Sequence, residues 1–94
     1  MTKKTTTEQL SRMLSIPKTR ALEATLKAQL IAAIVKEAGR RDLTHAELAQ
    51  RSGLPRSAVT GILAGSLQSV TIDRLLRLVE AAGLEAALRI RRAA

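Results

Sequence analysis

The sequence contains no aromatic residue: none of its 94 residues is Phe, Tyr or Trp. A folded core must therefore be built from Leu, Ile, Val and Ala, and an apolar fraction of 46% is high enough to supply one. Proteins that bind single-stranded nucleic acids stack the bases on aromatic rings, and many RNA-binding modules do the same. If the partner is a nucleic acid, duplex DNA is therefore favoured over single strands.

Cysteine is also missing, and the only histidine is His45. The chain therefore has no disulfide, no cysteine nucleophile and no thiolate ligand, and no pair of carboxylates has a spacing typical of acid–base catalysis. A metal site at His45 would need carboxylate partners, but the neighbouring Glu47 is expected to cap a helix. We expect no enzymatic activity, no catalytic residue, no metal and no cofactor.

Long apolar runs are absent as well. The sequence shows neither a secretory signal nor a segment that could span a membrane, which predicts a cytoplasmic protein. A chain of 94 residues has room for a single core and buries a modest share of its surface, so association with a second copy would stabilise it. We therefore expect an oligomer.

Acidic residues are scarce: 8 Asp and Glu stand against 16 Lys and Arg, which gives a formal net charge of +8. Such a charge creates a positive field that attracts polyanions, and nucleic acid is the obvious partner. The same charge could simply keep a small protein soluble. Composition alone does not decide between these interpretations.

Residues 44–65 favour the first interpretation, because they have the pattern of two short helices joined by a tight turn. Thr44 and Glu47 have the spacing of a capping box, which predicts that a helix starts at His45. Gly53 then ends this helix, because a residue without Cβ adopts the left-handed conformation at no steric cost.

The second helix of the pair is predicted to open at Pro55, whose φ is preset and which lacks an amide that a first helical turn would leave unpaired. Gly65 closes it. The helix carries polar residues at Arg56, Ser57 and Thr60 and apolar residues for the core at Val59, Ile62 and Leu63. This arrangement offers one helix to the major groove of DNA.

The segment before this pair predicts an arm and a scaffold helix. We expect a flexible N-terminal arm over residues 1–18 and a helix-turn-helix domain over residues 19–94. The scaffold helix runs over residues 20–38, with Gly39 as its C-cap. Its apolar stripe consists of Leu22, Leu26, Leu30, Ile31, Ile34 and Val35.

The segment after the pair predicts a further helix, which starts at the cap Thr71 and ends at Gly83. Its inward-facing residues are Leu75, Leu76, Leu78 and Val79. Residues 84–91 then alternate between apolar and charged or small residues, as in a strand. Because the chain offers no second strand, we expect this segment to pair with its copy across a two-fold axis, with Leu84, Ala86, Leu88 and Ile90 forming the dimer interface. A fifth helix over the same residues is the alternative.

The order and spacing of these segments resemble those of the lambda-repressor-like (Cro-type, XRE) helix-turn-helix family, in a subgroup that includes HigA-type antitoxins. The resemblance covers residues 20–91 and rests on the long first helix, the Leu-Thr-x-x-Glu-Leu-Ala run at 43–49, the glycine loop at 65–70 and the capped helix that follows. It implies an all-α fold of four to five helices with a possible C-terminal dimerisation strand. The sequence departs from the family pattern at His45, Pro55, Gly61 and Ser66.

The resemblance also implies which residues contact DNA. Arg56, Ser57 and Thr60 match the positions that read bases, and the planar guanidinium of Arg56 can bind O6 and N7 of guanine, a discrimination of about 1–3 kcal/mol. The residues predicted to contact the DNA backbone are Arg41, Thr44, His45, Arg51, Gln68 and Ser69. Each of these side chains could instead be an ordinary solvated group. Gly61 either lets the backbone approach the groove closely or only destabilises its helix.

Together these features predict a sequence-specific regulator of transcription that binds double-stranded DNA, a dimer that represses its own operon. The alternative is an antitoxin that neutralises a partner ribonuclease toxin and regulates its own synthesis through the same helices. The basic arm argues slightly against a cationic toxin as partner, because like charges repel.

Overall fold

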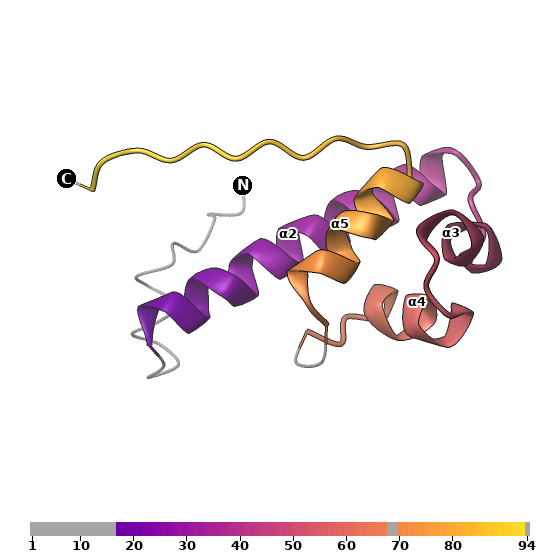
Figure 1. Ribbon diagram of the computed structural model, residues 1–94, viewed down its shortest axis with the longest axis horizontal. Coiled ribbons are helices and arrows are strands. Elements are labelled where there is room, and N and C mark those ends of the chain that lie inside the picture. The colour runs from indigo at the N-terminus through magenta and orange to yellow at the C-terminus, as the bar shows by residue number, and fades with distance from the viewer. Residues whose placement is uncertain (1–16, 68–69, 94) are drawn as a thin grey trace, which may run out of the picture.

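The computed structural model describes residues 17–67 and 70–93, and within them the chain forms four helices and no strand. In chain order these are α2 (Lys18–Arg40), α3 (His45–Ser52), α4 (Arg56–Leu63) and α5 (Ile72–Ala81) (Figure 1). The predicted all-α, helix-turn-helix fold is confirmed. Most of the predicted arm and the predicted contacts Gln68 and Ser69 lie outside the described residues.

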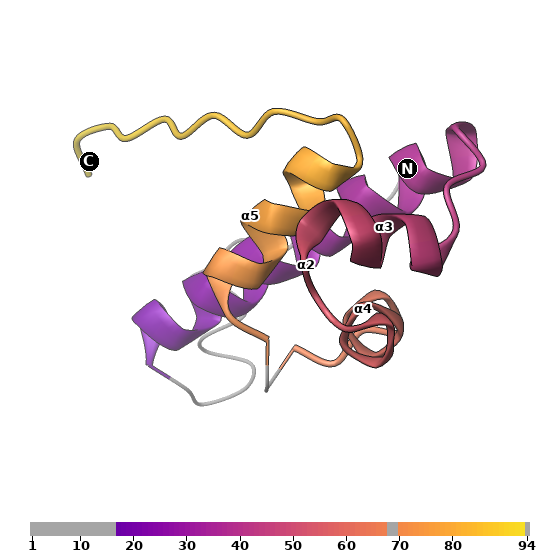
Figure 2. The same ribbon diagram turned by 45° about the vertical axis from the view of Figure 1, so that its right-hand side comes forward.

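The four helices pack around one core. The long helix α2 contacts both α4 and α5, and α3 also contacts both of them. In two views α4 and α5 lie on different sides of α3 (Figures 1 and 2). The largest fully buried side chains are Ile34, Leu48, Leu75, Leu78 and Val59, so that every described helix contributes to this aliphatic core. No helix in the described ranges has the length and apolarity needed to cross a membrane.

Helix α2 differs from its prediction in which face is buried. Its buried residues are Ala21, Lys27, Ile31, Ile34 and Ala38. Three residues of the predicted stripe are instead exposed, namely Leu22, Leu26 and Val35. The prediction was wrong there because apolar residues occupy more than one side of this 23-residue helix, whereas α4 and α5 cover only part of its circumference.

The end of α2 also differs from its prediction. The helix continues through Gly39, and the left-handed residue is Asp42, with φ 54°. The amide of Leu43 donates to the carbonyl of Ala38 over 2.9 Å, the long closing bond of a Schellman motif. The side chain of Leu43 packs against the core. To bring Leu43 there, the chain must turn at the residue before it, and Asp42 therefore takes the left-handed conformation.

Helix α5 begins as predicted, with the Thr71 hydroxyl accepting a hydrogen bond from the amide of Arg74 over 3.2 Å. Leu75, Leu78 and Val79 are buried, as predicted, but Leu76 is 44% exposed, which corrects its assignment to the core. Leu76 lies at the edge of the buried stripe, where no described residue covers it enough to bury it.

The segment after α5 is extended. Gly83, with φ 80°, turns the chain, and the amide of Leu84 donates to the carbonyl of Val79 over 2.9 Å. Residues 85–93 then run away from the helices in an extended conformation (Figures 1 and 2). The alternative of a fifth helix is therefore wrong. An extended backbone is what a strand needs, but no described residue pairs with it, so the predicted strand and the predicted dimer both stay predictions.

Candidate nucleic-acid interface

Both ends of α3 are built by local hydrogen bonds that the sequence predicts. The Thr44 hydroxyl accepts from the amide of Glu47, and the amide of Thr44 donates to Oε1 of Glu47, both over 3.1 Å. This is the expected capping box. At the other end of α3, Gly53 adopts φ 77°, and its amide donates to the carbonyl of Ala49 over 2.9 Å. Both ends of α3 are thus fixed.

The capping box also sets the ionisation of its carboxylate. Hydrogen bonds from the backbone amide and the hydroxyl of Thr44 lower the pKa of Glu47 below its ordinary value. The hydroxyl of Thr44 also donates to Glu47 over 3.1 Å. The structure therefore shows Thr44 as a capping residue, and its predicted contact with the DNA backbone stays a prediction.

Helix α4 starts one residue later than predicted. Pro55 is its N-cap, with φ −61° and ψ 145°, and Arg56 is the first helical residue. No side chain caps this end, so the first amides of α4 point outward without a side-chain acceptor. Leu54 anchors the turn, because its side chain is buried in the core and its amide donates to the Ser52 hydroxyl over 3.2 Å.

The exposed side of α4 carries the three predicted base-reading residues. Arg56, Ser57 and Thr60 are exposed, whereas Val59 and Ile62 are buried on the opposite side. The 3.6-residue period of the helix puts the three polar residues within one face. Contact with bases requires such exposure, and the contacts themselves stay a prediction.

His45 joins this face through a side-chain hydrogen bond. Its Nδ1 lies 2.9 Å from the hydroxyl of Thr60, a contact between the first residue of α3 and the middle of α4. Sequence spacing placed both residues near DNA but did not predict that they bond to each other. The bond restrains both side chains, and Nε2 of His45 is left to meet another group.

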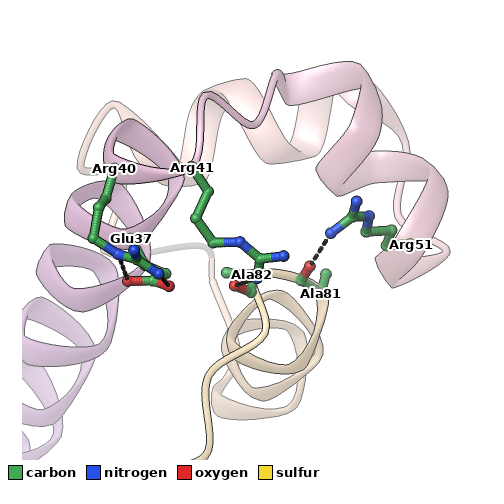
Figure 3. A network of polar contacts seen from close by, with 6 residues as sticks. All are labelled: Glu37, Arg40, Arg41, Arg51, Ala81 and Ala82. Carbon is green, nitrogen blue, oxygen red and sulfur yellow. Dashed lines mark hydrogen bonds and ion pairs between the residues drawn. The ribbon is translucent and has the colours of Figure 1, made fainter.

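Arg41 and Arg51 lie elsewhere, at the C-terminal end of α5 (Figure 3). Nη1 of Arg41 donates to the carbonyl of Ala82 over 3.0 Å, and Nη1 of Arg51 donates to the carbonyl of Ala81 over 3.4 Å. Carbonyls at a helix C-terminus attract cations, because they carry its unsatisfied negative partial charge. The structure therefore gives both arginines a role within the fold and does not bring them together with His45 and Arg56.

An ion pair lies nearby, at the C-terminal end of α2. Arg40 binds Glu37 through two hydrogen bonds of 3.0 and 2.6 Å. The hydrogen bond from Arg40 lowers the pKa of Glu37 and keeps it ionised. The positive charge of Arg40 is thus balanced locally by Glu37, so this pair adds no net charge to the surface.

One residue beside the recognition face was missed by the sequence reasoning. Arg74, in the first turn of α5, lines a hollow of about 200 Å³ together with Ser57, Ala58 and Gly61 of α4. A signal was present in the sequence: a cation three residues after the cap Thr71 stands where the helix dipole favours an anion. That unfavourable placement indicates a role outside the helix.

Comparison with known proteins assigns the chain to a family. The family model of the helix-turn-helix domain matches residues 9–91, a range that includes all four described helices. No curated protein and no solved structure matches the chain. The lambda-repressor-like subgroup with its HigA-type antitoxins stays a prediction. The match extends over most of the chain and coincides with the observed turn, and the chain belongs to the helix-turn-helix domain family, whose fold binds DNA.

Proposed function

We propose that this protein is a sequence-specific regulator of transcription that binds double-stranded DNA as a dimer and represses its own operon by steric exclusion. The observation that carries the proposal is the exposed face of α4, where Arg56, Ser57 and Thr60 stand together on the second helix of a helix-turn-helix. An exposed helix face with these hydrogen-bonding groups suits the donor and acceptor pattern of the major groove.

Arg56 is the principal base-reading residue in this proposal. It is exposed at the first position of α4, and its fork of donors fits O6 and N7 of guanine. Thr60 is held by His45, and its methyl group suits contact with thymine. When Nδ1 of His45 accepts a hydrogen bond from the Thr60 hydroxyl, Nε2 carries the ring hydrogen and can donate a hydrogen bond to a phosphate.

A dimer would read two half-sites of a palindrome about 34 Å apart, one turn of the duplex. The net charge of +8 supports strong attraction to the DNA backbone. If the dimer neutralises on the order of 6–10 phosphates, affinity falls roughly 10³- to 10⁵-fold between 50 and 200 mM salt.

The test begins with a selection of duplexes by the full-length protein from a randomised library of about 30 base pairs, enough for two half-sites. Binding of the selected duplex is then compared for the wild type, Arg56→Ala and the control Arg77→Ala, an exposed arginine of α5 that pairs with Asp73. Arg56→Ala should weaken binding by about 1–3 kcal/mol and relax the preference at one base pair in each half-site. If Arg56→Ala changes neither affinity nor base preference in a folded protein, α4 is not the recognition helix.

A further inference from the structure

Gly61 has no role within the fold that requires a glycine. Unlike Gly53 and Gly83, it does not have a positive φ, because it lies inside the helix α4. A Cβ built at Gly61 meets no atom within 4 Å apart from its own helix and chain neighbours, so packing does not require its absence either. Glycine in a helix interior destabilises the helix relative to alanine. The fold itself thus gives no reason for a glycine at this position.

Arg74 is a second residue whose presence the fold does not explain. It occupies the first turn of α5, where the positive end of the helix dipole disfavours a cation. Its guanidinium makes no hydrogen bond or ion pair with any residue in the described part of the chain, whereas Arg77, one turn later, pairs with Asp73 over 3.2 Å. Among the described residues Arg74 thus has no partner for its charge, in a position that the helix dipole disfavours.

These two residues meet in one place. Gly61 and Arg74 line the same hollow of about 200 Å³ between α4 and α5, and Ser57 lines it one helical turn before Gly61. Ser57 also belongs to the exposed face of α4, so the hollow adjoins the recognition face. Its wall at Gly61 is bare backbone, and a free guanidinium and a hydroxyl stand beside it. These are the groups that recognise a phosphate.

We infer that this hollow receives a phosphodiester of the DNA backbone, with Arg74 donating to its oxygens and the α4 backbone at Gly61 in van der Waals contact with the strand. The inference rests on the proposed function and adds a close approach that only glycine permits. Local rules broken without an internal gain are expected at functional sites, and here two such residues share one hollow.

The decisive variant is Gly61→Ala, because its two expected effects have opposite signs. The methyl group fills open space in the free protein and favours the helix, so the melting temperature rises by about 2–8 °C. In the complex the same methyl group meets the strand, and the affinity for the selected duplex falls by about 5- to 150-fold, the range expected for overpacking. A role confined to the fold would leave affinity unchanged.

The matched stability control is Gly39→Ala, which also replaces a helical glycine with open space around it, but in the last turn of α2. It should raise the melting temperature, and this rise is the comparison it supplies, because Gly39 itself lines a hollow with His45 and Thr60.

A second pair of variants tests the phosphate contact. Arg74→Gln should lower the slope of log affinity against log salt by about 0.9 for each bound protomer, equally for the selected duplex and for mixed-sequence duplex DNA. Arg77→Gln, the matched arginine of the same helix, should leave the slope unchanged. Unchanged affinity in Gly61→Ala, or an unchanged slope in Arg74→Gln, overturns the inference while the loss of binding in Arg56→Ala keeps the proposed function intact. If Arg56→Ala has no effect either, the proposed function itself fails.

Discussion

Asp42 carries strain that a different residue at this position would remove. Its φ of 54° is left-handed, a conformation that costs an ordinary L-residue about 1–2 kcal/mol, although Asp tolerates it better than most. The side chain of Asp42 makes no hydrogen bond or ion pair with the residues that the structure describes. Its own side chain thus does not stabilise the left-handed conformation.

We therefore predict that Asp42→Gly stabilises the protein. Glycine removes the left-handed penalty but gives the unfolded chain about 0.4–1 kcal/mol more conformational freedom, so a net gain of at most about 1 kcal/mol remains. Urea unfolding at neutral pH measures the change. A fall in the unfolding midpoint would show that the Asp42 carboxylate makes a stabilising contact.

A second residue, Glu47, links the stability of α3 to pH. Its folded pKa is lowered by the hydrogen bonds from Thr44, so its contribution to stability is present above its ordinary pKa and is lost as the pH falls through the folded value. We expect the wild type to be more stable than Glu47→Gln at neutral pH, and this difference to shrink in acid, below about pH 4.

Unfolding midpoints of the wild type and Glu47→Gln over this pH range test the prediction. The comparison isolates Glu47, because Glu37, whose pKa is also lowered, is present in both proteins. Parallel curves would mean that the capping box does not persist in solution.

At the scale of the elements, the C-terminus of α5 is held by the side chain of Arg41 and by the backbone at Gly83. Arg41 crosses from the end of α2 to the carbonyl of Ala82 (Figure 3). Gly83 makes room for it, because a Cβ at that position would collide with Nη1 of Arg41. The direction in which the C-terminal segment leaves the domain is thus tied to the end of α2.

We predict that Gly83→Ala destabilises the protein by about 1–2 kcal/mol because of its φ of 80°, and by more because Arg41 must leave Ala82. In an Arg41→Ala background the hydrogen bond from Arg41 to Ala82 has already been lost. The cost of Gly83→Ala should therefore be smaller there, with a coupling of about 0.5–1 kcal/mol in a double-mutant cycle measured by urea unfolding. Additive effects would show that the two residues do not interact.

The elements also show which parts of the fold the sequence could predict. The start of α3, its end at Gly53 and the cap Thr71 depend on neighbouring residues alone, and these predictions are confirmed. The buried face of α2 and the end of that helix depend on where α5 and Leu43 pack, which spacing along one helix does not specify. For the same reason, the bond between His45 and Thr60 and the hollow at Arg74 emerged only from the assembled fold.

At the scale of the whole molecule, the single chain leaves apolar side chains in water. Leu88 is 79% exposed and Ile90 is 83% exposed, both on the extended segment after α5. The predicted interface included Leu84, but its side chain packs against the core of its own chain. The part of the interface still available to a second copy is therefore Ala86, Leu88 and Ile90, which alternate along the segment and share one face.

The last prediction is that this face holds a dimer together. In the double variant Leu88→Ser with Ile90→Ser, the apolar area that a partner would cover is lost, while every arginine of the segment is retained. Sedimentation equilibrium should show a dimer for the wild type and a monomer for the variant, and affinity for the selected palindrome should fall because the two half-sites are no longer bound as one unit. The melting temperature of the diluted monomer should stay the same, since both side chains are exposed in the single chain.

Arg89→Ser, on the opposite face of the same segment, is the control and should remain dimeric. A dimer of wild-type strength in the double variant would place the interface on another surface, and a monomeric wild type would remove the dimer from the proposed function.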